Sequence, residues 1–309
     1  MVCRLLVIAG PTGVGKTATA VALARRLPLE VVSADSRQVY RGMDVATGKP
    51  TPEERRAVRH HLVDVVDPDE RYHAARFAAE ARAAIETISA RARLPVIVGG
   101  TGLYIRALLR GLDPGVPADP EFRRELATIA TSEGRAALHA RLEHEAPAIA
   151  RRLHPNDQVR VIRALELLRH GAPVATEQVR WQTPDHGDET VLCVGLTMPR
   201  ARLASRLRAR TRAMVEAGLL AEVRALLGRG YDESLTAMQG IGYREFARVA
   251  RGELDVAEAL RLMERDTLRY AKRQWTWFAR EAGIQWMDVE AAGGPAGAAE
   301  EVERMINDR

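Results

Sequence analysis

The sequence predicts an α/β fold in which a parallel sheet is flanked by helices and interrupted by an all-helical insertion. The run Arg4 to Gly10 is apolar and leads through a glycine-rich loop into a helical pattern from Thr17 to Leu27. Further apolar runs alternate with helical stretches, as in doubly wound sheets. Prolines and turn formers between 112 and 120 then introduce a long stretch that has no strand candidate.

The first half of the chain supplies three strand candidates in order. The first is the run that begins at Arg4, the second is Leu29 to Ala34, and the third is Leu94 to Val98, which ends at a Gly-Gly-Thr-Gly turn. The stretch Ala74 to Arg93, rich in alanine and arginine, is expected to form a helix before the third strand. This alternation of strands and helices is typical of a doubly wound α/β sheet.

Helical patterns dominate the second half. They extend to about Arg169, and a break from Trp181 to Glu189 precedes a further strand candidate, Thr190 to Leu196. Long helices are expected over 200–229 and 256–281, with a loop and a short helix after Glu290. We therefore predict a core over 1–114, a helical insertion over 115–187, and a continuation of the core with C-terminal helices over 188–309.

Composition limits the class of protein. A chain of 309 residues with 46% hydrophobic residues can bury a large core. Cys3 and Cys193 are too far apart in sequence to indicate a disulfide framework or a zinc site, and the run Met1 to Gly10 resembles neither a signal peptide nor a membrane span, so we expect a cytosolic protein. The net charge of +5 and the pI of about 9.5 permit a polyanionic partner.

The loop after the first strand fits the complete P-loop pattern. Its residues are Gly10, Pro11, Thr12, Gly13, Val14, Gly15, Lys16 and Thr17. Backbone N–H groups of such a loop form a nest for phosphate, Lys16 adds a point charge, and the Thr17 hydroxyl is a ligand for Mg²⁺. The motif predicts a bound polyphosphate on a P-loop NTPase-like sheet, without saying which polyphosphate.

No carboxylate follows the strand that ends at Val98, where a nucleotide-hydrolysing P-loop protein normally carries the acid of its magnesium shell. Gly99 and Gly100 follow instead, and they would let the backbone approach a ligand closely while Thr101 presents a hydroxyl. A tight strand-to-helix turn is the alternative interpretation. The missing acid indicates that the phosphate site serves another reaction.

Asp35 directly follows the second strand. Because the carboxyl ends of parallel strands line the ligand crevice, this side chain is expected beside the P-loop. Asp is also a common helix cap, and Ser33, Asp35 and Ser36 before a helix would suit that role. The residues alone leave capping and catalysis equally open.

Together these blocks resemble the tRNA dimethylallyltransferase family. The match includes the P-loop, Ser33 to Asp44, Thr47 to Pro50, His60 to Leu62, Val98 to Tyr104, His154 to Asp157, Arg163 to Glu166, Gly240 to Tyr243 and Ala271 to Gln274. It covers nearly the whole chain, and it contains all three lysines, Lys16, Lys49 and Lys272. Some eukaryotic relatives carry a C-terminal zinc finger; without cysteines there, this chain resembles the short bacterial form.

The resemblance implies transfer of a dimethylallyl group from dimethylallyl diphosphate to N6 of the adenosine next to the anticodon, position 37, with release of diphosphate. Asp35 would be the base, Thr101 would contact the leaving oxygen, and Lys16 and Thr17 with Mg²⁺ would hold the diphosphate. Arg206 and Arg210 are similar to the family's diphosphate clamp and share a helix face. We expect a monomer.

The resemblance also implies that the insertion holds the tRNA anticodon stem-loop. Arginines that track phosphates and stack on loop bases suit single-stranded RNA, although each arginine could equally form a surface ion pair. The residues implied to contact tRNA are Asp35, Ser36, Arg37, Gln38, Thr101, Arg123, Gln158, Val159, Arg160, Val161, Ile162, Arg163, Gly240, Gly242, Lys272, Arg273 and Gln274. Trp275, Trp277 and Phe278 are expected in the core.

Three other functions remain open at this point. An adenylate dimethylallyltransferase would use the same P-loop and donor with a free nucleotide, but the helical insertion with its arginines favours tRNA. A P-loop kinase of a small metabolite would turn over ATP. A non-catalytic RNA-binding protein would hold a nucleotide as a structural ligand, which the placement of Asp35 and Thr101 at strand ends disfavours.

Overall fold

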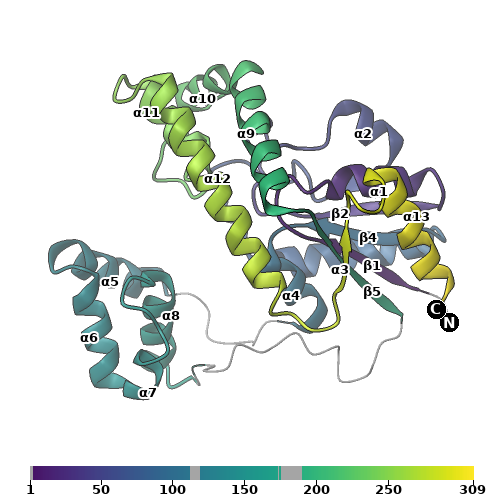
Figure 1. Ribbon diagram of the computed structural model, residues 1–309. Coiled ribbons are helices and arrows are strands. Elements are labelled where there is room, and N and C mark those ends of the chain that lie inside the picture. The colour runs from purple at the N-terminus through teal and green to yellow at the C-terminus, as the bar shows by residue number, and fades with distance from the viewer. Residues whose placement is uncertain (1–2, 112–118, 173, 175–189) are drawn as a thin grey trace. The chain divides into compact units, whose positions relative to one another are not determined.

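A computed structural model describes residues 3–111, 119–172, 174 and 190–309. These residues form two compact units, an α/β unit from the parts before 112 and after 180, and a helical unit from the part between (Figure 1). The predicted junctions at 114/115 and 187/188 lie outside the described residues, so these exact boundaries stay predictions.

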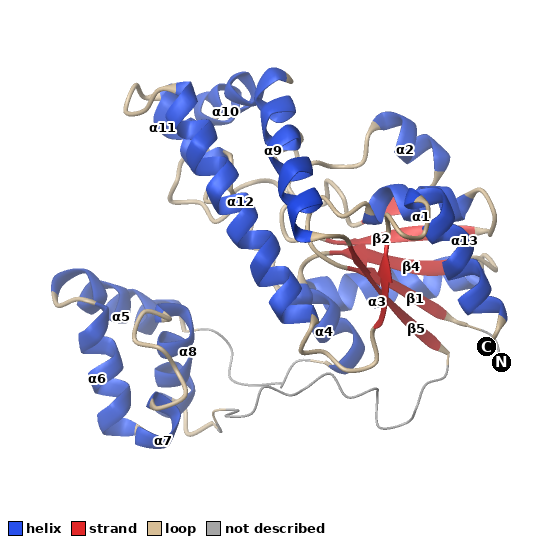
Figure 2. Cartoon of the chain, in the orientation of Figure 1, coloured by secondary structure: helices blue, strands red, loops and turns tan. Residues whose placement is uncertain are grey.

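The α/β unit is built on a six-stranded parallel sheet with strand order β3-β2-β4-β1-β5-β6 (Figure 2). The strands are β1 (Leu5–Ala9), β2 (Leu29–Ala34), β3 (His60–His61), β4 (Leu94–Gly99), β5 (Val191–Thr197) and β6 (Gln285–Asp288). The predicted α/β fold is confirmed. The edge strands β3 and β6 were not predicted, because two and four residues are too short to show a period in sequence.

Helices cover both faces of this sheet. They are α1 (Lys16–Ala24), α2 (Pro52–Ala57), α3 (Ala74–Ala90), α4 (Gly102–Arg110), α9 (Arg200–Glu216), α10 (Leu219–Gly228), α11 (Tyr243–Ala250), α12 (Val256–Phe278) and α13 (Gly294–Asn307). The helix predicted over 200–229 is two helices, because Gly218 adopts φ 97° between α9 and α10. Trp275, expected in the core, is 50% exposed, whereas Phe278 is fully buried.

Alternate residues of each central strand enter two separate cores. In β1, Leu6 and Ile8 pack with α1 and α13, while Val7 and Ala9 pack with the helices of the opposite face. This alternation is the expected period of a strand that is buried on both sides. Parallel pairing, with Ala9 and Ala34 both opposite Gly99, places the carboxyl ends of β1, β2 and β4 together at one edge of the sheet.

The helical unit has its own core. It comprises α5 (Pro120–Ser132), α6 (Arg135–Glu145), α7 (Pro147–Ala150) and α8 (Gln158–Arg169). Phe122, Leu126, Leu138, Leu142 and Leu165 pack together there, each 2% exposed or less. Across the described parts of both units, no helix combines the length and apolarity needed to cross a membrane.

Candidate active site

The P-loop lies between β1 and α1, as its motif predicts. Gly10 adopts φ 143°, and a Cβ there would lie 2.5 Å from the Leu196 carbonyl oxygen on β5, so only glycine lets the loop turn so close to the neighbouring strand. The Lys16 Nζ donates to the carbonyl oxygens of Gly10 and Pro11 at 3.0 and 2.9 Å. The lysine side chain therefore folds back along the loop that carries it.

Burial changes the acidity of Lys16. The pKa of the ammonium group is lowered to about 8, chiefly by burial; the negative charge of Asp35 opposes the shift, and the positive charge of Arg210 adds to it. Burial also lowers the pKa of Arg210, which lies near Asp35 and Arg206. Two cations held in a poorly solvated place create a strong attraction for an anion.

A cavity of about 530 Å³ opens beside the P-loop. Its cationic residues are Lys16, Arg206 and Arg210, and its oxygen-bearing residues include Thr17, Asp35 and Glu54. Arg206 and Arg210 both come from α9, one turn apart, as their spacing predicts. We call this space the phosphate cavity.

Gly48 brings the backbone against Arg210. A Cβ at Gly48 would lie 1.8 Å from Arg210 Nη2, and the same glycine carbonyl accepts from Gln38 Nε2 at 3.1 Å. Lys49, the next residue, donates to the Tyr40 carbonyl and pairs with Asp44 and Asp64. This second motif lysine is thus structural and anchors the segment that shapes the wall beside Arg210.

Asp35 stands at the end of β2, where the sequence predicted it. Its Oδ1 accepts the Arg37 N–H at 2.8 Å, and the residues that follow form a turn rather than a helix, since α2 begins only at Pro52. The structure therefore gives Asp35 an Asx-turn bond and not the helix-capping role. The side chain lines the phosphate cavity and a second cavity as well.

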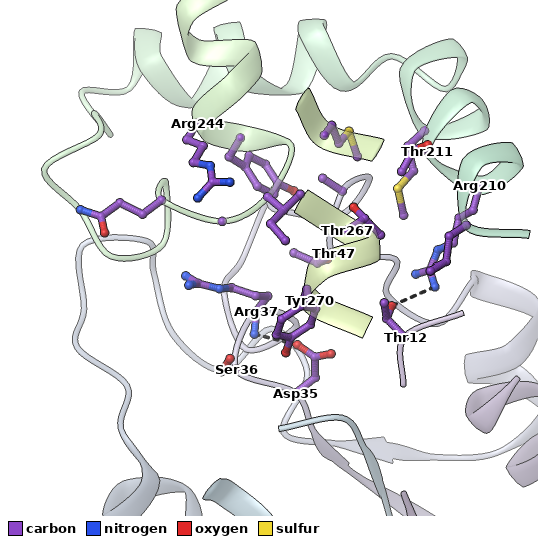
Figure 3. A pocket seen from close by; sticks show the side chains of 18 of the residues that line it. Thr12, Asp35, Ser36, Arg37, Thr47, Arg210, Thr211, Arg244, Thr267 and Tyr270 are labelled. Carbon is purple, nitrogen blue, oxygen red and sulfur yellow. Dashed lines mark hydrogen bonds between the residues drawn. The ribbon is translucent and has the colours of Figure 1, made fainter. Parts of the chain in front are cut away.

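The second cavity has a volume of about 260 Å³, and Asp35 lies in its lining (Figure 3). We call it the acceptor cavity. Four residues line both cavities: Thr12, Asp35, Thr47 and Arg210. Its apolar lining includes Ala46, Leu207, Met214, Ile241 and Met263, and its polar lining includes Arg37, Gln239, Arg244 and Arg273. The two spaces therefore meet around one carboxylate and one guanidinium.

Tyr270 on α12 is a site residue that the sequence interpretation missed. It lines the acceptor cavity close to Asp35 in Figure 3. Burial and the negative charge of Asp35 raise the pKa of its phenol to about 12, and a bond with the Thr101 side chain opposes the rise. Its position one turn before Gln274, which lies in a matched motif, is the signal that could have identified it.

Thr101 lines neither of the two cavities and instead contacts the turn that follows Asp35. Its Oγ1 accepts the Ser36 N–H at 3.0 Å, and its N–H donates to the Ala34 carbonyl. Gly99 is needed for close packing within the protein, since a Cβ there would lie 2.1 Å from the Ala34 carbonyl oxygen. Gly99 also lines the phosphate cavity. The tight-turn interpretation thus accounts for most of this block.

The other residues implied to contact tRNA in the α/β unit divide by exposure. Ser36, Arg37, Gly240 and Arg273 line the acceptor cavity, Gln38 lines the phosphate cavity, and Lys272 is exposed. Gly242 is buried with φ 94°, and Gln274 is 5% exposed. The assignment of these last two residues as tRNA contacts stays a prediction.

In the helical unit, Glu166 gathers two of the predicted arginines. Arg123 Nη2 and Arg163 Nη1 lie 2.7 and 2.5 Å from the fully buried Glu166 carboxylate, which also accepts the Asp119 N–H. Burial alone would raise the pKa of Glu166, but these bonds outweigh it and lower that pKa to about 2. Arg123 and Arg163 therefore have a structural partner in addition to any RNA contact.

The rest of the predicted tRNA set in this unit lies at the start of α8. Gln158 is half-buried, Val159 is 81% exposed, and Arg160 is exposed and pairs with Asp157 at 3.5 Å. Ile162 packs against the helical core, and Val161 is fully buried within it. The assignment of Val161 as a tRNA contact stays a prediction.

The oxygen donors of the phosphate cavity fit Mg²⁺. The Thr17 hydroxyl and the carboxylates of Asp35 and Glu54 share this lining. Mg²⁺ prefers hard oxygen ligands and is commonly completed by substrate phosphates and water. Glu54, which the sequence interpretation missed, also accepts the Thr51 N–H at 2.8 Å in a capping box, so its position is fixed by the start of α2.

Comparison with known proteins gives a consistent result. Residues 38–281 match the model of a family described as IPP transferase. The chain is 50% identical to a tRNA dimethylallyltransferase of Anaeromyxobacter dehalogenans, over 92% of this chain and 94% of that one. It is 47% identical to a tRNA dimethylallyltransferase of Syntrophobacter fumaroxidans, over 94% and 85% of the two chains.

Solved structures agree over nearly all of the chain. The full-length tRNA isopentenylpyrophosphate transferase of Bacillus halodurans is 40% identical with a TM-score of 0.68, and the alignment covers 98% of this chain and 99% of that one. A eukaryotic dimethylallyltransferase described as acting on tRNA is 28% identical with a TM-score of 0.77, over 99% and 80% of the two chains.

Proposed function

The chain belongs to the IPP transferase family, and we infer from this premise that it is a tRNA dimethylallyltransferase: it transfers the dimethylallyl group of dimethylallyl diphosphate to N6 of an adenosine, at position 37 of tRNA. The observation that supports this most directly is the junction of two cavities at Asp35 and Arg210. A reaction between a diphosphate ester and a nucleobase needs one space for each partner and a shared reaction point.

The diphosphate of the donor occupies the phosphate cavity in this proposal. The P-loop amides and Lys16 bind one end of it, and Arg206 and Arg210 on α9 bind it from the opposite side. A planar guanidinium offers paired donors to phosphate oxygens. Mg²⁺ held by Thr17 and the diphosphate would supply charge neutralisation for the leaving group.

The prenyl tail and the base share the acceptor cavity. Leu207, Met214, Ile241 and Met263 supply apolar surface for a five-carbon chain, and Arg37, Gln239, Arg244 and Arg273 supply polar contacts for the nucleotide. A base reaches such a pocket only after it leaves the stack of its loop. The mixed lining therefore suits an apolar tail beside a polar ring.

Asp35 accepts the proton in the transfer step. The N6 lone pair of adenine is delocalised into the ring, so attack on the allylic carbon requires proton removal together with stabilisation of the departing diphosphate. Asp35 lies between the two spaces and takes the N6 proton, while Lys16, Arg206 and Arg210 bind the diphosphate as its bond to carbon breaks. Thr101 holds the turn after Asp35 through the Ser36 amide.

The helical unit binds the anticodon stem-loop in this proposal. Arg160 and Val159 are exposed at the first turn of α8, where an arginine and an apolar side chain can contact a phosphate and a base. Arg123 and Arg163 keep 42% and 35% of their side chains exposed while paired with Glu166. They present donors to RNA from a fixed position.

Labelled dimethylallyl diphosphate, incubated with the protein, Mg²⁺ and unmodified tRNA, tests the function. Label should appear in tRNA at the adenosine next to the anticodon, with one diphosphate released per group transferred. Parallel reactions with AMP and with ATP alone test the two alternatives. Label in AMP would indicate an adenylate dimethylallyltransferase, and ATP turnover without the prenyl donor would indicate a kinase.

A further inference from the structure

Gln274 on α12 joins two parts of the active site that are distant in sequence. Its Oε1 accepts the Thr12 N–H in the P-loop at 2.8 Å, and its Nε2 donates to the Gly100 carbonyl oxygen after β4 at 2.9 Å. The side chain is 5% exposed. A buried amide with both ends bonded to backbone is a cross-link within the protein rather than a surface contact.

The chain makes room for this cross-link. A Cβ at Gly100 would lie 2.1 Å from Gln274 Nε2, so a larger residue there would displace the amide. One turn further along α12, Trp277 closes on Gly102 in the same way, since a Cβ at that glycine would lie 2.1 Å from Trp277 Nε1. The face of α12 that carries Tyr270, Gln274 and Trp277 therefore contacts the cavity and the turn after β4 in succession.

At the P-loop, Gln274 accepts a hydrogen bond from the peptide group between Pro11 and Thr12. The Pro11 carbonyl accepts from Lys16 Nζ at 2.9 Å, and the N–H of the same peptide, on Thr12, donates to Gln274. The bond to Gln274 does not involve Lys16, so it need not break when Lys16 turns towards a bound phosphate. The orientation of Thr12, whose Oγ1 lies 3.5 Å from Arg210 Nη1, is thereby preserved.

At its other end, Gln274 donates a hydrogen bond to the peptide group between Gly100 and Thr101. The Gly100 carbonyl belongs to this peptide, and its N–H, on Thr101, donates to Ala34 O at 3.2 Å. The Thr101 hydroxyl in turn accepts the Ser36 amide, next to Asp35. One amide side chain thus connects the loop that binds the leaving group to the turn that carries the base.

We propose that Gln274 is a positioning residue that sets the spacing between the P-loop and Asp35, and that it is not a contact for tRNA. The inference rests on the proposed function, because it assigns the spacing to the transfer step. Errors of about 1 Å in the position of reacting groups cost on the order of 10²-fold in rate. The cross-link should therefore act on the rate of transfer more than on the binding of tRNA.

The variant Gln274→Met tests this, since it keeps a long unbranched side chain and removes both hydrogen bonds. Gln285→Met is the matched control, because Gln285 is exposed on β6 and lines neither cavity. The measurements are the single-turnover transfer rate with both substrates saturating, the tRNA affinity, and the melting temperature. We expect a rate about 10- to 100-fold lower, with tRNA affinity within twofold of the parent.

Two other combinations of rate and affinity would contradict the proposal. A tenfold weaker tRNA affinity with a normal saturated rate would make Gln274 a tRNA contact, and a normal rate with normal affinity would remove its role altogether. If Gln274→Met does not fold, Gln274→Glu replaces it: this variant keeps the acceptor for Thr12 and loses the donor to Gly100, so a parental rate would overturn the proposal. Absence of transfer by the parent would instead refute the proposed function.

Discussion

The cations beside the phosphate cavity and the two arginines around Glu166 have opposite surroundings. In the α/β unit, Lys16 and Arg210 border an open cavity, and the described residues show no ion pair between either of them and a carboxylate. In the helical unit, Arg123 and Arg163 enclose the carboxylate of Glu166. Both arrangements lie in motifs of the same family.

This difference distinguishes cations that are available to bind a ligand from cations that stabilise the fold. A cation in a poorly solvated place that has no ion pair with a carboxylate is stabilised when an anion binds, and the same burial is the main reason that the pKa of Lys16 falls to about 8. A carboxylate between two arginines is already neutralised, and despite its burial the pKa of Glu166 falls to about 2. Sequence motifs alone do not distinguish the two cases.

The largest effect is expected at Asp35, the carboxylate that lines both cavities. Asp35→Asn keeps the shape and the bond from the Arg37 amide but cannot accept the N6 proton. The single-turnover rate with saturating tRNA and donor should fall by about 10²- to 10⁴-fold, at unchanged melting temperature. Asp288→Asn is the control, since Asp288 also ends a strand and accepts a following amide, from Glu290. A rate within threefold of the parent would leave Asp35 only its turn-forming bond.

Lys16→Met should follow in size. The change removes a charge that would stabilise the departing diphosphate, and the loss of one such group costs roughly 10²- to 10³-fold in rate. Arg208→Met on α9 is the control: it removes an exposed cation that lines neither cavity. Near-normal transfer by Lys16→Met would exclude the P-loop lysine from the mechanism.

Glu166→Gln tests the ion pairs of Glu166 with Arg123 and Arg163 through the stability of the helical unit. Breaking a buried ion pair should destabilise the helical unit by about 3 kcal/mol, whereas Glu145→Gln, in an exposed pair with Arg141, should cost well under 1 kcal/mol. Urea unfolding of both variants measures this. Because the folded pKa lies below the usual 4.5, the contribution of Glu166 is complete above that pH and is lost as the pH falls towards 2.

Donor binding should depend on pH through Lys16. The protonated lysine attracts the diphosphate and the neutral lysine does not, so the affinity for dimethylallyl diphosphate without tRNA should fall by roughly five- to tenfold over the pH unit above 8. Calorimetry should show proton uptake on binding in that range. The inflection should disappear in Lys16→Met, and its persistence there would assign it to another group.

The smallest effect is expected at Arg160. Its side chain is 57% exposed, and Arg160→Ala should weaken tRNA binding a few-fold and reduce the salt slope of the affinity by about one. Arg135→Ala, an exposed arginine at the start of α6, is the control. Equal losses in both variants would show a diffuse charge effect instead of a specific contact by α8.

The P-loop and the central strands could be predicted because their signals are local. An apolar run, a fixed glycine spacing and a helical period place Gly10, Lys16 and Thr17 without any knowledge of the rest of the chain. Asp35 was placed at the site by the rule that strand ends share one edge of the sheet. The resemblance to a family then supplied the reaction.

What the sequence could not show depends on contacts between distant segments. Gln274 stands 262 residues after Thr12, so no local pattern links the two. Arg123 and Glu166 look like any surface charges until α5 and α8 are packed together. Tyr270 lies outside the matched motifs, and its place one helical turn before Gln274 is a weak signal until α12 is seen to pass beside Asp35.

The strand order of the sheet also constrains how the protein is made on the ribosome. Strand β1 pairs with β4 on one side and with β5 on the other, yet β5 is synthesised only after the helical unit. Helix α13 packs on α1, and its Glu303 pairs with Arg26, just after the end of α1; this helix is synthesised after every strand of the sheet. The helical unit, whose contacts are local, can fold while one edge of β1 is still unpaired and exposed to association with other chains. The P-loop is thus made early in synthesis, yet it is among the last parts of the nascent protein to gain its full support.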